Sequence, residues 1–375
     1  MTSYNGKAIN VTRPIVAQVT YKKINLLKFA KTAFISNDNW SFGHKLLLIS
    51  QKKTQKSKSA MIVDIDPSFL MRLSENDIIQ VLPNGRINVL WEKKLNPYDI
   101  TLFITNQCNA KCIMCPQPPK KDKYPLLDTN LFILKNLTNE PIKKIGITGG
   151  EPTTKPNDLI KILKQAYQSF PTSKIDLLTN AKKLSDFSLA KEISIANPNI
   201  IYCVSFPSDN MEDFNNIMGG DFYKTTMQSI QNLAILRQNI ELRIVISKKN
   251  YSRLLQISEF IYRNFPFVQH IAFMGMEVIG YAYENLQELD ISPREYNVHL
   301  LDAIRFLSRC HMNASIYNIP FCLIDKRLWK FICNSISAWK QNYVNECNLC
   351  IKKDNCPGLF STSKVQKYSL SPIMS

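Results

Sequence analysis

The sequence lacks any long apolar segment. No uninterrupted apolar run approaches the roughly 18 residues that a membrane-spanning helix needs, and no apolar run follows the first basic residues as a secretory signal requires. We therefore expect a cytoplasmic protein that has no membrane partner. Disulfides are rare in that reducing compartment, so the 10 cysteines are expected to be metal ligands, catalytic groups or core residues.

Acidic residues are also scarce, because 30 Asp and Glu stand against 47 Lys and Arg, a formal net charge of +17. Residues 1–97 hold 15 Lys and Arg and only 6 Asp and Glu, so over half of the excess lies in this part of the chain. Such charge attracts polyanions, but it also arises where basic residues simply solvate a surface. No aromatic-plus-basic RNA-binding module is recognisable, so a nucleic acid is not the expected partner.

The sequence has no repeat of fixed period, and its first 97 residues predict a small β-rich module. The stretch "QKKTQKSKSA" (51–60) has the composition of an exposed loop, either an insertion or a linker. Short β-type runs follow it, with an Asn-Gly turn at Asn84 and Gly85, and the module closes near Pro97.

From Asp99 onward, six short apolar runs recur about every 30 to 45 residues, and several are separated by stretches of helical periodicity. In one such stretch Leu159, Ile160, Leu163 and Tyr167 are expected to share a helical face. Six β-then-α units imply parallel strands with right-handed crossovers, closed or nearly closed into a barrel; an open doubly wound sheet is the alternative. The runs are "DITLFIT", "KKIGIT", "KIDLLT", "IIYCVSF", "ELRIVI" and "HIAFMGM".

The pattern changes after about residue 285, where a helix, a short extended piece and a second group of cysteines follow. The sequence therefore predicts an α/β protein in three parts. These are an N-terminal β-rich module at 1–97, a partial (β/α)6 barrel at 98–285 and a C-terminal extension at 286–375.

Three cysteines, Cys108, Cys112 and Cys115, follow the first apolar run directly. They are expected on the loop at the C-terminal end of the first strand, which is where β/α barrels place their chemistry. Three thiolates can hold three irons of a 4Fe-4S cluster and leave the fourth iron open to a substrate or cofactor. A structural zinc or a structural cluster takes four ligands instead, and the four-residue first step is not the usual zinc knuckle.

A second motif, "TGGEPT", stands at the end of the second apolar run. Gly149 and Gly150 let the backbone come close to a small ligand, and the carboxylate of Glu151 beside them can hold an ammonium group. Alone, such a motif is an ordinary turn. Its position one strand after the cysteine triad makes coincidence improbable.

The two motifs together resemble those of the radical S-adenosylmethionine (SAM) superfamily. The resemblance implies that SAM binds the open iron, that a reduced cluster passes one electron to it, and that the resulting 5′-deoxyadenosyl radical abstracts hydrogen from the substrate. It also implies an external electron donor such as flavodoxin or ferredoxin. The protein's part is to orient SAM and to exclude water.

The resemblance further assigns contacts with SAM. The residue before the last cysteine matches a position that packs on adenine, and the Gly-Gly-Glu-Pro motif faces the amino acid end. Polar residues on the third to fifth strands reach ribose, carboxylate or substrate, unless they are ordinary strand residues. The predicted SAM contacts are Met114, Gly149, Gly150, Glu151, Pro152, Asn180, Ser205 and Arg243.

A second cysteine group lies near the end of the sequence. Cys347, Cys350 and Cys356 form a C-x2-C-x5-C arrangement, and Cys322 lies some 25 residues earlier. Four thiolates fill every iron of a second 4Fe-4S cluster, so this centre would be closed. Cysteine-only zinc is the alternative, because the first two of these residues form a proper knuckle.

This group resembles the C-terminal extensions of radical SAM enzymes that carry an auxiliary 4Fe-4S cluster, which are typical of members acting on peptides and proteins. Cys333 or Cys310 can replace Cys322 in the prediction. Cys203 lies within an apolar strand and is interpreted as a small buried hydrophobe.

The segment 99–360 resembles the radical SAM maturase of the His-Xaa-Ser peptide system, C type. This implies modification of a ribosomally made precursor peptide that carries His-Xaa-Ser repeats, alongside a companion radical SAM maturase. The basic N-terminal module is a candidate for holding the leader of that peptide, or else packs as an appendage. The segments that carry the resemblance are "TNQCNAKCIMCPQPPK", "GITGGEPT", "FPFVQHIAFMGMEVIGYA", "YNIPFCLIDKRLW", "SISAWKQNY" and "CNLCIKKDNCPGLF".

Two other classes of function stay open. One is a radical SAM enzyme that acts on a nucleotide, in molybdopterin biosynthesis or on RNA, although "SLSPIMS" does not provide the Gly-Gly tail expected of the former. The other is a non-enzymatic scaffold in which both cysteine groups bind zinc.

Overall fold

The computed structural model describes residues 3–22, 32–35, 46–48, 60–335, 340–363 and 370–374. The loop predicted at 51–60 falls outside this part of the chain except for Ala60. Within the described ranges, no helix is both long enough and apolar enough to cross a membrane. The chain divides into two compact units, one formed by Met1–Ile100, Tyr124–Lys144 and Gln168–Ser173, and the other by Thr101–Lys123, Ile145–Tyr167 and Lys174–Ser375.

The first unit is built on a sheet with the strand order β1-β8-β7-β3-β4-β5-β6-β2. All six side chains of β3 are buried, so this strand runs through the core. Helix α1 begins after Asp66, whose carboxylate accepts from the Ser68 amide, and it buries Phe69 and Leu70 in the same core. Its elements are β1 (Ser3–Asn5), β2 (Lys7–Ile9), β3 (Ile15–Thr20), β4 (Thr32–Ile35), β5 (Leu46–Leu48), β6 (Met61–Val63), α1 (Pro67–Arg72), β7 (Ile78–Val81) and β8 (Arg86–Trp91).

The predicted Asn-Gly turn is confirmed. Strands β7 and β8 pair antiparallel, and the Leu82 amide donates to the Arg86 carbonyl at 2.9 Å across the turn. Gly85 has a φ of +84°, and a Cβ there would lie 1.9 Å from the carbonyl oxygen of Gly6. Only glycine fits this position, which is why the turn signal was reliable.

Helix α2 (Leu127–Asn136) follows the first barrel strand in sequence but groups with the first unit. The Gln18 amide donates to the Asn136 carbonyl at 3.5 Å, and Lys93 pairs with Glu140 at 2.9 Å. The first unit is therefore discontinuous in sequence. The predicted divisions at residues 97 and 285 do not follow this packing and stay predictions.

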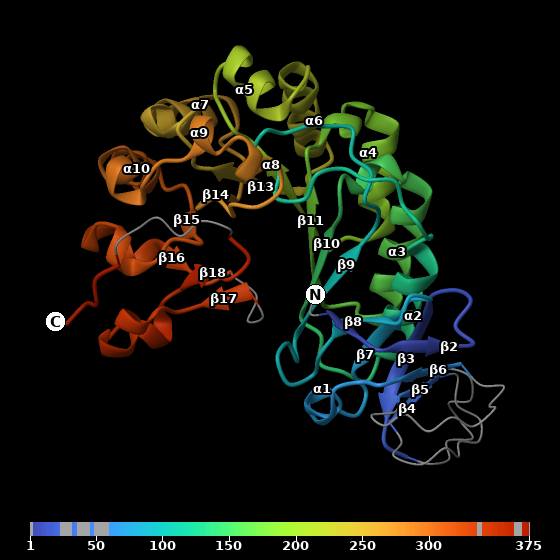
Figure 1. The fold of residues 1–375 in the computed structure, drawn as a ribbon. Helices are drawn as coiled ribbons and strands as arrows, with labels where there is room; N and C mark the ends of the chain where they lie inside the picture. The colour runs from blue at the N-terminus through green and yellow to red at the C-terminus, as the bar shows by residue number, and fades with distance from the viewer. Residues whose placement is uncertain are drawn as a thin grey trace. The chain divides into compact units, whose positions relative to one another are not determined.

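The second unit contains the predicted partial barrel, which is confirmed as an α/β fold with an open, curled sheet (Figure 1). The strand order is β16-β15-β14-β13-β12-β11-β10-β9, and the pairs from β11 to β16 are parallel. All six predicted strands are present, and two short ones extend the sheet. The strands are β9 (Asp99–Phe103), β10 (Lys144–Thr148), β11 (Lys174–Thr179), β12 (Ile200–Ser205), β13 (Asn239–Val245), β14 (His270–Met274), β15 (Ala314–Tyr317) and β16 (Ile332–Cys333).

The helices pack along the convex side of this curled sheet (Figure 1). Helix α10 has the strongest start signal, a capping box formed by Ser292 and Glu295. A short hairpin, β17 (Gln341–Asn342) and β18 (Leu359–Phe360), follows near the C-terminus. The helices are α3 (Pro156–Ser169), α4 (Phe187–Ala196), α5 (Met211–Met218), α6 (Tyr223–Ile235), α7 (Leu254–Asn264), α8 (Tyr281–Glu284), α9 (Leu286–Leu289) and α10 (Pro293–Arg309).

The buried face of α3 differs from the predicted one. Leu159 and Leu163 are buried as expected, but Ile162 and Ala166 complete the face, while Tyr167 is 43% exposed. Positions i, i+3, i+4 and i+7 form the stripe that faces a sheet, and Tyr167, at i+8, falls on the edge of that stripe.

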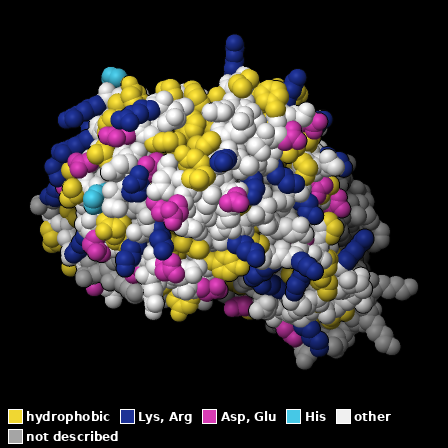
Figure 2. Space-filling view, turned by 90° about the horizontal axis from the view of Figure 1, so that it is seen from above, with side chains coloured by type: hydrophobic (Ala, Val, Ile, Leu, Met, Phe, Trp, Pro, Cys, Tyr) yellow, Lys and Arg dark blue, Asp and Glu magenta, His cyan; other side chains and the backbone are white. Residues whose placement is uncertain are grey.

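The surface shown in Figure 2 carries Lys and Arg side chains interspersed with Asp, Glu and hydrophobic side chains. On this face the basic residues do not gather into one patch. The excess of 17 positive charges is therefore at least partly a dispersed, solvating charge here.

We predict that Leu163→Ala lowers the free energy of unfolding by about 2–5 kcal/mol, because it leaves a cavity under a fully buried side chain. Tyr167→Ala is the matched control on the same helix and should cost less than about 1 kcal/mol. Urea unfolding followed by circular dichroism measures both. Equal losses in the two variants would contradict the assignment of the buried face.

Candidate functional site

The three-cysteine loop, residues 105–117, leaves the C-terminal end of β9 as predicted. Cys108, Cys112 and Cys115 are all partly exposed on it. The loop is held from the side by α5, because the Ile113 amide donates to the Ile217 carbonyl at 3.0 Å. The helix ends at Gly219, where a Cβ would lie 2.3 Å from the Lys111 carbonyl oxygen.

The Gly-Gly-Glu motif packs directly on this loop. The Gly150 amide donates to the Thr105 carbonyl at 2.7 Å, and the Glu151 amide donates to the Gln107 carbonyl at 2.8 Å. A Cβ on Gly149 would lie 2.4 Å from the Thr105 oxygen, and one on Gly150 would lie 2.1 Å from the Gln107 oxygen. Neither position has room for a side chain, so the two glycines allow the motif loop to support the cysteine loop.

Glu151 has a second role that its motif did not reveal. Its side chain is buried and accepts four hydrogen bonds: from the amide and hydroxyl of Thr153, from the Thr179 hydroxyl, and from the Asn180 amide, at 2.7 to 3.0 Å. Burial is the largest effect on this carboxyl and raises its pKa, and the four donors offset only part of that rise. The carboxylate thus fixes the ends of β10 and β11 together, and its contact with an ammonium group stays a prediction.

Asn180 joins the same site. Its side-chain amide donates to the Asn109 carbonyl oxygen at 2.7 Å and lies 3.9 Å from the sulfur of Cys108. Pro152 is buried at the start of the short turn of helix after Glu151. Met114 is half-buried on the cysteine loop.

The last two predicted SAM contacts, Ser205 and Arg243, lie on the strands of the sheet and face its concave side. Ser205 ends β12 and is in register with Arg243 on β13, so the two residues belong to one layer of the sheet. Tyr202 points the other way, because its hydroxyl contacts Ser194 of α4. Since side chains alternate along a strand, Cys203 faces the concave side with Ser205. Cys203 is buried there, as predicted.

A charged network that the sequence did not predict surrounds Arg243. Its Nε donates to Glu241 at 2.6 Å, and its Nη2 lies 3.9 Å from Asp176. Glu241 also contacts Nδ1 of His270 at 2.8 Å, and Nε2 of His270 contacts the Ser315 hydroxyl at 2.9 Å. The network joins β11, β13, β14 and β15. Its only signal in the sequence is the presence of polar residues in apolar strands, which the register brings together.

This network fixes the charge of Glu241. Burial alone would raise its pKa, but the hydrogen bond from His270 and the charge and hydrogen bond of Arg243 outweigh burial and lower the pKa to about 2. Arg243 is held in turn by Glu241 and Asp176, and these charges contribute to raising its pKa above the usual range. The concave side therefore carries fixed, mutually paired charges.

Burial raises the pKa of all three thiols of the cysteine loop. Burial raises the pKa of Cys108 to about 11 and that of Cys112 to about 12. Among the described residues, no three His, Cys, Asp or Glu side chains are placed to hold a single metal ion, and the Cys115 thiol contacts the Gln117 carbonyl at 3.0 Å. The loop fits a 4Fe-4S cluster in the number, type and position of its donors, and binding would have to release their protons.

The four C-terminal cysteines lie around one hollow, and their role as ligands of one cluster stays a prediction. Cys322, Cys347, Cys350 and Cys356 all line one hollow of about 430 Å³. Residues 370–373 cover part of it, and the Ile373 amide lies 3.5 Å from the sulfur of Cys350. Burial raises the pKa of both Cys322 and Cys356. The donor set fits a closed cluster of four thiolates.

The two substitutes for Cys322 lie elsewhere. Cys310 caps the C-terminus of α10, and Cys333 pairs with Tyr317 at the edge of the barrel sheet. Neither lines the four-cysteine hollow. Of the three candidates, only Cys322 lines this hollow, and its role as the fourth ligand stays a prediction. The segment "SISAWKQNY" that supported the resemblance lies partly outside the described residues, at 336–339.

Comparison with known proteins agrees with this site. Residues 102–261 match the model of the Radical SAM superfamily. Among solved structures, Streptococcus suis SuiB bound to S-adenosylmethionine has a TM-score of 0.51 at 16% identity, covering 60% of this chain and 52% of that one. SuiB bound to the precursor peptide SuiA gives a TM-score of 0.50, also at 16% identity, and covers 60% and 50%. At this identity the likeness shows the fold alone.

The relatives found by sequence comparison are named as GTP 3′,8-cyclases, unlike the SuiB structures. The GTP 3′,8-cyclase of Pasteurella multocida is 30% identical over 140 residues, which are 36% of this chain and 40% of that protein. The GTP 3′,8-cyclase of Helicobacter pylori is 26% identical over 208 residues, 53% and 64% of the two chains. The chain therefore spans less than two thirds of the length of these relatives.

We predict that Glu241→Gln flattens the acid dependence of stability. A carboxyl whose pKa is lowered from 4.5 to about 2 on folding stabilises the fold above pH 4.5, and this contribution disappears as the pH falls toward 2. Between pH 7 and pH 3.5, the natural protein should lose about 1 kcal/mol more free energy of unfolding than the variant. Urea titrations at the two pH values measure this. Parallel losses would mean that the network does not hold Glu241 ionised.

Proposed function

We propose that the protein is a radical SAM enzyme that modifies a ribosomally made peptide by hydrogen abstraction. The observation that carries the proposal is the separation of two cysteine groups in one unit, three thiols on the loop after β9 and four around one hollow. Three donors leave one iron of a 4Fe-4S cluster open, whereas four donors leave none. When bound there, the cluster and SAM would supply a 5′-deoxyadenosyl radical.

The chain's own residues would orient the cofactor and shield it. The cysteine loop and the Gly149–Glu151 loop support each other through backbone hydrogen bonds, so the cluster site is held in place before SAM arrives. Asn180 lies beside Cys108 and Asn109, where its amide is within reach of a ligand on the same loop. We assign the other predicted SAM contacts, including Met114, Ser205 and Arg243, on the resemblance to the superfamily.

The peptide substrate is the finer part of the proposal. The four-cysteine extension resembles the auxiliary-cluster extensions of peptide-modifying members, and residues 99–360 resemble the maturase of the His-Xaa-Ser system, C type. We therefore propose a precursor peptide with His-Xaa-Ser repeats as substrate and a companion radical SAM maturase as partner. We also propose that the basic module at residues 1–97 holds the leader of that peptide.

A nucleotide substrate is the second candidate, because the curated relatives are named GTP 3′,8-cyclases. A nucleoside triphosphate needs cationic partners for its phosphates. Two register layers of side chains face the concave side, and Arg243 is the one permanently charged cation in them. The layers consist of Ser205, Arg243, Ala272 and Ser315 and of Cys203, Glu241 and His270. That cation already contacts Glu241 and Asp176, which favours the peptide.

We predict that the reduced protein cleaves SAM to 5′-deoxyadenosine, that a His-Xaa-Ser precursor peptide increases the release, and that GTP does not. Chromatography of the nucleoside and mass spectrometry of the peptide give both readouts. Cys112→Ala should reduce release to the level without protein, whereas Cys310→Ala, outside both groups, should retain it. If GTP increased the release of 5′-deoxyadenosine and the mass of the peptide did not change, the substrate would be a nucleotide and not a peptide.

We also predict about eight iron atoms per chain in anaerobically reconstituted protein and about four in Cys350→Ala. Cys333→Ala is the control and should retain all of them, because Cys333 does not line the four-cysteine hollow. Iron and zinc analysis together with the broad absorption near 400 nm measures this. Colourless protein with stoichiometric zinc would support the scaffold instead.

A further inference from the structure

One segment contacts both the three-cysteine loop and the segment that contains three of the four C-terminal cysteines. The linking segment, residues 275–285, runs from the end of β14 through α8. At one end the Tyr281 amide donates to the Cys115 carbonyl at 2.9 Å, and the Asn285 side chain donates to the Ile113 carbonyl at 3.1 Å. Gly280 has a φ of +58°, and a Cβ there would lie 2.9 Å from the Cys115 oxygen. This end is therefore packed against the three-cysteine loop without room for a larger residue.

The other end holds the C-terminal cysteine segment, residues 340–363, which contains Cys347, Cys350 and Cys356. The carboxylate of Glu277 accepts from Lys340 Nζ at 2.9 and 3.0 Å and from the Thr362 hydroxyl at 2.5 Å. The Val278 amide donates to the Ser363 hydroxyl at 3.2 Å.

These contacts are made by residues at the two ends of the antiparallel pair β17–β18. Lys340 directly precedes β17 and Thr362 follows β18, and the Ser361 amide donates to the Lys340 carbonyl at 2.6 Å, which closes the pair. From inside the hairpin, Gln341 and Tyr343 donate to the carbonyl of Cys356 at 3.2 and 2.8 Å. One carboxylate is thus connected through a short hairpin to a predicted cluster ligand.

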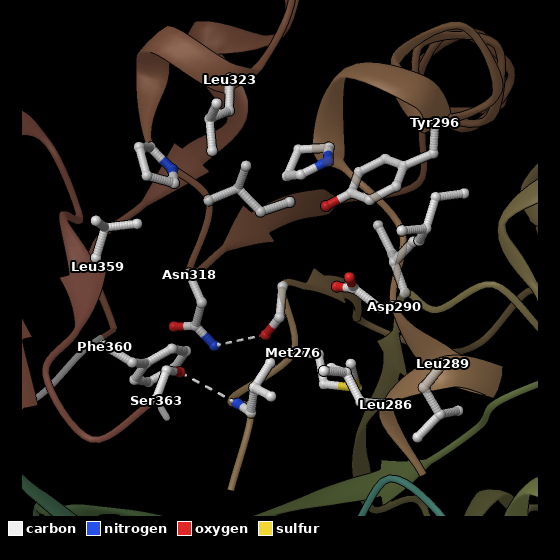
Figure 3. Close-up of a pocket in the computed structure, with 17 residues that line it drawn as sticks. Met276, Leu286, Leu289, Asp290, Tyr296, Asn318, Leu323, Leu359, Phe360 and Ser363 are labelled. Carbon is white, nitrogen blue, oxygen red and sulfur yellow. Dashed lines mark hydrogen bonds between the residues drawn. The ribbon is translucent and has the colours of Figure 1, made fainter. Parts of the chain in front are cut away.

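Apolar side chains of the two segments meet around a hollow: Figure 3 shows Met276 on one side and Leu359 and Phe360 on the other, and Val278 also lines it. A hollow contributes fewer dispersion contacts than a packed core. The Glu277 side chain is only 11% exposed and Lys340 only 26%, so their ion pair is less screened than a surface pair. These partly buried polar contacts therefore add to the apolar contacts in attaching the two segments.

We propose that Glu277 is a positioning residue that fixes the C-terminal cysteine segment and, through the linking segment, sets the conformation of the three-cysteine loop. The attachment itself stands on the contacts above, and it rests on the proposed function only in treating both cysteine groups as cluster sites. Loss of the Glu277 carboxylate loosens both groups, although the residue touches no cysteine side chain in either.

Hydrogen–deuterium exchange of the full-length, anaerobically purified protein tests this. In Glu277→Gln, peptides from residues 340–363 should exchange roughly tenfold faster, and peptides from residues 112–118 should also accelerate, whereas residues 174–196 should not. Glu288→Gln is the matched control, because Glu288 pairs with Lys249 at 2.8 Å on an exposed surface of the same unit. That control should leave both regions unchanged.

A charge swap provides the rescue. Glu277→Lys combined with Lys340→Glu restores an ion pair and should recover most of the lost protection, whereas Glu277→Lys alone should not. If the Glu277 variants do not fold, Thr362→Val removes one of the same hydrogen bonds and should give a smaller acceleration in the same two regions.

Two results would overturn the proposal: unchanged exchange in residues 340–363, or acceleration there without any in residues 112–118. Neither depends on SAM cleavage. A protein that protects these regions through Glu277 but releases no 5′-deoxyadenosine would end the proposed function and leave this inference standing.

Discussion

The backbone contact between the loops after β9 and β10 is the constraint on which the rest of the candidate site depends. Two amide-to-carbonyl hydrogen bonds and two glycines without room for a Cβ hold Gly149–Glu151 against Thr105–Gln107. This contact fixes the start of the loop, and the contacts of Ile113 with α5 and of Cys115 with Tyr281 hold the rest of it, because the loop has no secondary structure of its own. The contact converts two short sequence motifs into one rigid rim at the C-terminal ends of the parallel strands.

Buried charge reinforces this rim. Glu151 joins the end of β10 to the end of β11 through the donors of Thr179 and Asn180, and Glu241, which contacts both Arg243 and His270, joins β13 to β14 on the concave side. Each of these groups would cost free energy if buried alone, and each is instead satisfied by its neighbours. The interior of the partial barrel is therefore a preorganised polar surface, which suits a site that has to orient a charged cofactor.

The sequence predicted the parts of this structure that depend on local pattern. Each of the six strands from β9 to β14 forms at a short apolar run whose local preference agrees with the fold. The position of the three cysteines directly after the first run places them on the loop after β9. Cys322 was predicted as the fourth C-terminal cysteine from its position and from the family resemblance, with Cys333 and Cys310 as substitutes, and of the three only Cys322 lines the hollow with the other cysteines.

The parts that were missed depend on partners distant in sequence. Helix α2 follows β9 yet packs with the N-terminal sheet, and no local signal indicates which sheet an amphipathic helix chooses. The network of Glu241 and His270 forms only because the parallel register places them side by side. Glu277 reads as an ordinary loop residue until Lys340 and Thr362, more than 60 positions away, are placed beside it.

The central claim is that the polypeptide leaves one iron of the first cluster open to SAM. Electron paramagnetic resonance of the reduced Cys350→Ala protein tests it most directly, because the signal then arises from the three-cysteine loop alone. The account predicts that SAM shifts the g values of that signal in a saturable manner. A spectrum that stays unchanged at saturating SAM would contradict it.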